Sequence, residues 1–203
     1  LKIGHSVRSI SDCVRAARND VTIATNIMET RTICGEDAIR NNMLKKTSPN
    51  RIWPLKLWPS NEFFKAKLLE QNKRHAKHGN TEYNLEPNIK EAPGGLRDIQ
   101  TINWVAKRHF RVNSIEELIG DNFITPDEYL QLKRNEAFLW RVRYALHLVA
   151  GRPEERLLFD HQRKIALMFG YKDGEKRLGV EQFMQHYYQV VLSIRAVSYT
   201  HLR

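Results

Sequence analysis

Apolar residues recur at three- and four-residue steps along the second half of the chain, which is the spacing of one face of an α-helix. The clearest stripe has four members: Phe138, Val142, Ala145 and Val149. Upstream, Thr125 is placed to cap a helix, Pro126 suits its first position, and Glu128 completes a capping box. Because Gly151 supplies a stop, the pattern predicts a long helix over 126–150.

Similar but weaker patterns predict further helices. Ser114 begins a second capping box, which predicts a short helix ending near Gly120. Asp160 is a candidate cap for a helix over 162–169, and an apolar stripe over 183–194 predicts the last helix. We also expect helices over segments with less distinct ends, at about 21–33, 61–77 and 96–110.

Alternation with period two, which is typical of strands, occurs only over 1–7 and weakly near 83–85. We therefore expect a mainly α fold, a helical bundle preceded by the end of a sheet-containing domain. Segment 47–60 contains three prolines, which exclude a continuous helix. We place a Pro- and Trp-containing linker there, between a first domain over 1–46 and a helical domain over 61–203.

The composition fits an ordinary packed domain, because the 203 residues are 41% hydrophobic with only 7 Pro and 10 Gly. No apolar run approaches the roughly 20 residues of a membrane span, and the N-terminus does not read as a secretory signal. Cys13 and Cys34 form neither a disulfide framework nor a four-ligand zinc site. We expect a cytoplasmic protein that does not contact membrane. Since it lacks an initiator Met, we interpret the chain as a fragment.

The charge balance leaves two interpretations open. Lys and Arg number 33 against 23 Asp and Glu, a net charge of +10, and most of the excess lies in the first half. Such an excess can attract phosphates, or it can be a solvated face without a ligand. Basic and aromatic residues interleave at 107–110, which suits a non-catalytic helical module that binds nucleic acid or a protein partner. We interpret His75 and His78 as part of a solvated basic face.

The densest polar motif is segment 85–100, which combines acids, bases, two prolines and a glycine pair before a predicted helix. Gly94 and Gly95 permit a positive φ and a close backbone approach, so the following amides can face an anion or another loop. The alternative is a sharp turn in which Arg97 and Asp98 pair locally.

The same segment resembles the signature of the bacterial protein-PII uridylyltransferases, the bifunctional uridylyltransferase/uridylyl-removing family. The resemblance runs to about Ala196, after which the tail 197–203 departs from the family pattern. Further matching segments are 4–9, 20–31, 34–36, 104–110, 138–147 and 156–162. It implies that the chain holds the last strand and helices of a nucleotidyltransferase α/β domain, followed by a helical domain.

The resemblance also implies the reaction and its reactants. The full-length enzyme transfers UMP from UTP to protein PII and removes it by hydrolysis, with Mg²⁺ held by carboxylates. This chain has no D-x-D pair and no His-Asp dipeptide. We therefore expect no catalytic or metal-binding residue in it and an inactive fragment. The resemblance also favours protein PII and UTP over a nucleic-acid partner.

Two groups of residues become site candidates by resemblance. The candidates for the end of the nucleotide cleft are Gly4, His5, Ser6, Arg8 and Asp20, although Asp20 is better explained as a helix cap. The polar signature turn comprises Glu86, Asn88, Lys90, Gly94, Gly95, Arg97 and Asp98. We expect Glu86, Lys90, Arg97 and Asp98 to form one polar network that fixes the helical domain to the cleft.

Overall fold

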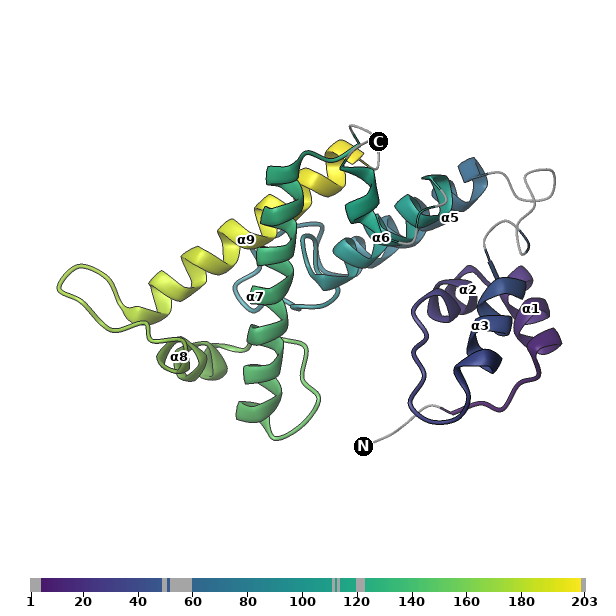
Figure 1. Ribbon diagram of the computed structural model, residues 1–203. Coiled ribbons are helices and arrows are strands. Elements are labelled where there is room, and N and C mark those ends of the chain that lie inside the picture. The colour runs from purple at the N-terminus through teal and green to yellow at the C-terminus, as the bar shows by residue number, and fades with distance from the viewer. Residues whose placement is uncertain are drawn as a thin grey trace. The chain divides into compact units, whose positions relative to one another are not determined.

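The computed structural model describes residues 5–48, 51, 60–110, 112, 114–119 and 123–201. The chain divides into two compact units (Figure 1). The first unit comprises 1–66 with 108–111, and the second comprises 67–107 with 112–203. The described residues are mostly helical and contain no strand longer than an isolated bridge. The predicted mainly α fold is therefore confirmed.

The first unit contains three short helices, α1 (Ile10–Asn19), α2 (Val21–Met28) and α3 (Asp37–Lys46). Ser9 caps α1 in a capping box with Asp12. Asp20 ends α1 and caps α2, where its carboxylate accepts a hydrogen bond of 2.7 Å from the amide of Thr22. Helix α1 packs against both α2 and α3, and the small side chains of Ala17 and Ala24 are fully buried.

The second unit is built from longer helices. Helix α5 (Ser60–Lys77) and helix α6 (Leu96–Phe110), of which residues 67–77 and 96–107 belong to this unit, are joined by the signature turn. They are followed by the 3-10 helix η1 (Ile115–Leu118) and by α7 (Pro126–Ala150), α8 (Phe159–Met168) and α9 (Gly179–His201). Helices α7, α8 and α9 pack against one another in pairs, with α7 and α9 crossing in Figure 1.

The core of this unit contains the stripes that the sequence predicts. Val142 on α7 and Phe183 and Ile194 on α9 are all fully buried. Thr125 and Glu128 form the expected capping box, and Gly151 ends α7 with a φ of 64°. The predicted helices over 61–77, 96–110, 126–150 and 183–194 are confirmed, as is the short helix after Ser114. No described helix has the length and apolar content needed to cross a membrane.

Two predicted helix boundaries are wrong. Helix α2 ends at Met28 rather than near 33, and the hydroxyl of Thr30, just past its end, donates to the carbonyl of Ile27 at 2.9 Å. Helix α8 begins at Phe159, with Leu158 rather than Asp160 as its cap residue. The sequence patterns also missed α1 and α3.

The expected strands are absent from the described residues. Residues 5–9 are neither helix nor strand, and neither are residues 83–85. Residues 1–4, most of the linker over 47–60, Gly120 and the tail positions 202 and 203 lie outside the described part of the chain.

Candidate functional site

The signature turn is shaped by local hydrogen bonds that its own side chains provide. The side-chain oxygen of Asn88 accepts hydrogen bonds from the amides of Lys90 (3.1 Å) and Glu91 (2.7 Å). An Asn side chain placed this way mimics a backbone turn. The amide of Ile89 also donates to the carbonyl of Glu155 at 2.8 Å, which anchors the turn to the segment that follows α7.

Neither glycine of the turn can be replaced by a residue with a Cβ atom without a steric clash. Gly94 has a φ of +74°, and a Cβ atom built there would lie 2.2 Å from the carbonyl oxygen of Val191 on α9. A Cβ on Gly95 would lie within 2.9 Å of the carbonyl oxygens of Ile89, Lys90 and Ala92. The glycine pair therefore allows the turn to close on itself and to touch α9.

The centre of the site is Asp98, in the first turn of α6, whose side chain is 0% exposed. Its carboxylate accepts hydrogen bonds from the donors Arg74 Nη2 (2.8 Å), Gly94 N (2.8 Å), Gln71 Nε2 (3.0 Å) and His75 Nε2 (3.0 Å). Three of these donors lie on one face of α5, at positions separated by three and four residues. A buried carboxylate thus joins α5, the turn and α6.

The same cluster reaches α9 and the far side of the turn. Gln71 Nε2 also lies 3.2 Å from the hydroxyl of Ser198. Arg74 Nη1 donates to the carbonyl of Glu91 at 2.9 Å, while its Nε is buried with no hydrogen-bond partner among the described residues. The Asp98 cluster therefore connects four parts of the second unit.

Electrostatics keep Asp98 ionised. Burial alone would raise the pKa of its carboxyl group, but the hydrogen bond from His75 and the positive charge of Arg74 together outweigh that effect. The pKa of Asp98 is therefore held below its ordinary value. A buried ion pair of this kind fixes geometry, and removing either partner leaves an uncompensated charge.

A second group of cations surrounds Trp104 on α6. The Nζ of Lys67 lies 4.3 Å from the centre of the indole ring, and the guanidinium of Arg97 lies 5.6 Å from it. Lys67 is 2% exposed and pairs with Glu70, and its burial lowers the pKa of its ammonium group despite that pair. Arg97 also donates to Gln100 at 2.7 Å.

These contacts correct the network expected for the turn. Glu86 does not belong to the Asp98 cluster. Its carboxylate accepts a hydrogen bond of 3.1 Å from the amide of Phe159, at the start of α8, and forms an ion pair of 3.0 Å with Arg156. Glu86 thereby caps α8, although it lies far from that helix in sequence. Arg97 bonds to Gln100 rather than to Asp98, so the local pair considered as an alternative is not formed either. Among the described residues, no carboxylate pairs with Lys90.

Sequence reasoning missed the three donors on α5. His75, interpreted as part of a solvated face, instead bonds to Asp98 with a side chain only 17% exposed. Gln71 and Arg74 are buried as well. Their spacing with His75 placed them on one helical face, but nothing in the local pattern indicated a buried carboxylate opposite that face.

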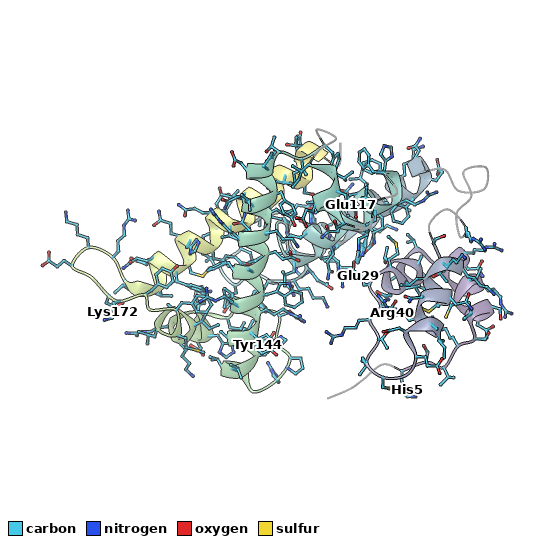
Figure 2. The ribbon with its side chains drawn as sticks, in the orientation of Figure 1. His5, Glu29, Arg40, Glu117, Tyr144 and Lys172 are labelled. Carbon is cyan, nitrogen blue, oxygen red and sulfur yellow. The ribbon has the colours of Figure 1, made fainter. Side chains whose placement is uncertain are left out.

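The cleft candidates lie in the first unit. Ser6 and Arg8 line a cavity of about 430 Å³, and Arg8 also lines a neighbouring one of about the same volume beside Cys34. His5, labelled in Figure 2, is exposed, and Gly4 lies outside the described residues. Asp20 has its carboxylate engaged as the cap of α2.

The described residues do not fit a magnesium ion. Within the described ranges, no group of three or more His, Cys, Asp or Glu side chains comes together as a metal site. Divalent magnesium requires several oxygen ligands in octahedral geometry. The carboxylate of Asp98 is saturated by donors from the protein, so it has no lone pair directed at a metal.

The sequence is similar to one protein family and to several enzymes of known activity. A family model described as GlnD PII-uridylyltransferase matches residues 62–202, which includes the turn and most of the tail expected to depart from the family. The bifunctional uridylyltransferase/uridylyl-removing enzyme of Pseudomonas aeruginosa strain LESB58 is 54% identical over 194 residues, 96% of this chain and 21% of that enzyme. That of Stutzerimonas stutzeri strain A1501 is 52% identical over 198 residues, 98% of this chain and 21% of that enzyme.

The chain thus spans about a fifth of the length of the curated relatives that it matches. No solved structure matches it significantly.

Proposed function

The chain belongs to the GlnD PII-uridylyltransferase family, and we propose from this membership that it is part of a bifunctional enzyme acting on protein PII. The full-length enzyme transfers UMP from UTP to a tyrosine of PII and removes it by hydrolysis. The observation that carries this proposal is identity of 50% or more, over nearly the whole chain, to enzymes named for both activities. We also propose that the enzyme is cytoplasmic, where UTP is available.

Within that enzyme we assign this chain a supporting role. The metal-binding carboxylates of both reactions would lie outside it, because transfer of a nucleotidyl group depends on positioned charges that the described residues do not assemble. The second unit would hold the signature turn rigid through Asp98. Ser6 and Arg8 would line the end of the nucleotide cleft, where a guanidinium group can donate to phosphate oxygens.

A transfer assay tests this proposal. The full-length protein, incubated with labelled UTP, magnesium and PII, should label PII, whereas the 203-residue chain should not. Labelling of PII by the chain alone would show that it contains the catalytic groups. A full-length protein that never labels PII would favour a non-catalytic basic module instead.

The role of Arg8 has its own test in the full-length enzyme. Arg8→Ala should raise the KM for UTP, because a phosphate contact is lost. Arg18→Ala is the matched control, since Arg18 is exposed on α1 and lines neither cavity. Equal KM values for the two variants would remove Arg8 from the cleft.

A further inference from the structure

Helix α7 carries an apolar stripe on the face that points away from its buried stripe. Tyr144, labelled on the lower part of α7 in Figure 2, is 73% exposed, and Leu148 is 69% exposed. The exposed apolar members, spaced by three, four and seven residues, are Leu130, Ala137, Trp140, Tyr144 and Leu148. We call these five residues the outer stripe of α7.

The geometry of the outer stripe suits a second helix. Helix rise places Leu130 and Leu148 about 27 Å apart along α7, which is a length of five helical turns. The small Ala137 lies seven residues from both Leu130 and Tyr144, so larger side chains flank a smaller one in the repeat that two packed helices share. Lys133 and Arg134 interrupt the stripe between Leu130 and Ala137, and it is contiguous from Ala137 to Leu148. Isolated exposed apolar residues are ordinary, but several on one face of one helix are typical of an interface.

One edge of the stripe is positively charged. Arg134 and Arg141 lie seven residues apart on this edge, both exposed, and neither forms an ion pair with a described carboxylate. On the opposite edge Glu136 is already paired with Lys133 at 3.0 Å. The guanidinium of Arg141 lies 5.0 Å from the centre of the Phe169 ring but has no described carboxylate partner. This edge of the outer stripe is therefore positive, and it complements acidic side chains.

We propose that the outer stripe of α7 is the docking site of an amphipathic helix with an acidic edge, supplied by a part of the full-length enzyme outside this chain. The composition supports docking, since Trp, Tyr and Arg contribute most of the binding energy in protein interfaces. The source is argued from length, because the chain spans about a fifth of its curated relatives. The inference rests on the proposed function only in taking the chain as part of a longer protein.

Hydroxyl-radical footprinting tests the proposal, because the oxidation rate of a side chain follows its exposure. Tyr144 and Leu148 should oxidise several-fold more slowly in the full-length protein than in the 203-residue chain. Tyr187, which is buried on α9, should be slow in both. Arg134→Glu in the full-length protein should bring the rate at Tyr144 back toward that of the chain, whereas Arg163→Glu, on the exposed face of α8, should not.

Three results would overturn the proposal: equal rates at Tyr144 in the two proteins, slow oxidation already in the 203-residue chain, or no response to Arg134→Glu. Footprinting requires no catalysis. A full-length protein that protects Tyr144 but never labels PII would therefore contradict the proposed function and leave the docking site standing.

Discussion

The backbone of Gly94 lies directly against the carbonyl group of Val191 on α9, at a separation that leaves no space for a Cβ atom. The contact brings the signature turn and the last helix together within the second unit. Two separate requirements meet at this glycine, because its φ of +74° is also a value that other residues adopt only at a cost.

Gly94→Ala should therefore destabilise the chain strongly. The left-handed backbone costs roughly 1–2 kcal/mol for an alanine, and displacing α9 adds a further cost of overpacking of about 1–3 kcal/mol. Gly151→Ala is a matched control, since Gly151 also has a positive φ but no atom within 4 Å of a built Cβ. Urea unfolding should show a clearly larger loss for Gly94→Ala, and equal losses would show that α9 yields easily.

Asp98 should make the stability of the chain sensitive to acid. Its folded-state pKa lies below the ordinary value of 3.8, so its contribution is fully present above pH 3.8 and is lost as the pH falls through the folded-state pKa. Asp98→Asn removes one partner of a buried pair and should cost about 3–5 kcal/mol at pH 7.

The difference between wild type and Asp98→Asn should shrink below pH 3.8, because the carboxyl group of the unfolded wild-type chain is protonated first and that of the folded chain follows only as the pH falls through its lower pKa. Denaturant unfolding at several pH values measures this difference. Asp160→Asn, at an exposed position on α8, is the control and should follow the wild type. A difference between Asp98→Asn and wild type that stays constant down to acidic pH would mean that folding does not lower the pKa of Asp98.

Val142→Asp should prevent folding or reduce stability by several kcal/mol. Val142 is fully buried on α7, so the substitution places an unpaired charge in the core. Tyr144→Asp, two residues further along the same helix at an exposed position, should leave the free energy of unfolding nearly unchanged in the 203-residue chain. A soluble Val142→Asp variant that unfolds cooperatively with wild-type stability would contradict the core assignment.

Local sequence patterns predict the ends of a helix correctly where capping residues and apolar periodicity agree. Thr125, Glu128 and Gly151 marked both ends of α7, because a cap acts through hydrogen bonds within a few residues. The local pattern predicts the wrong start for α8, because the side chain that caps this helix is Glu86, which is distant in sequence and accepts a hydrogen bond from the amide of Phe159. For the same reason the composition of the turn indicated a polar cluster, but not the donors on α5 that complete it.

Arg97 and Arg74 show most clearly where local sequence failed to predict a contact that depends on tertiary packing. From sequence, Arg97 was the expected partner of Asp98, yet its guanidinium bonds to Gln100 and lies over Trp104, whereas Arg74 forms the buried pair. A partly exposed cation near an aromatic ring contributes only about 0.5–1 kcal/mol. Breaking a buried pair costs about 3–5 kcal/mol.

Arg97→Ala should consequently cost about 1 kcal/mol or less, and Arg74→Ala several times more, when both are measured by urea unfolding of the same chain. Arg74→Lys should recover only part of the loss, because one ammonium cannot reach both Asp98 and the carbonyl of Glu91 as the two Nη atoms do. In the full-length enzyme, UMP transfer should follow the same order, since the turn depends on Asp98 being held. If Arg97→Ala abolishes transfer while its melting temperature stays at the wild-type value, Arg97 acts on the reactants and the supporting role assigned to the turn is wrong.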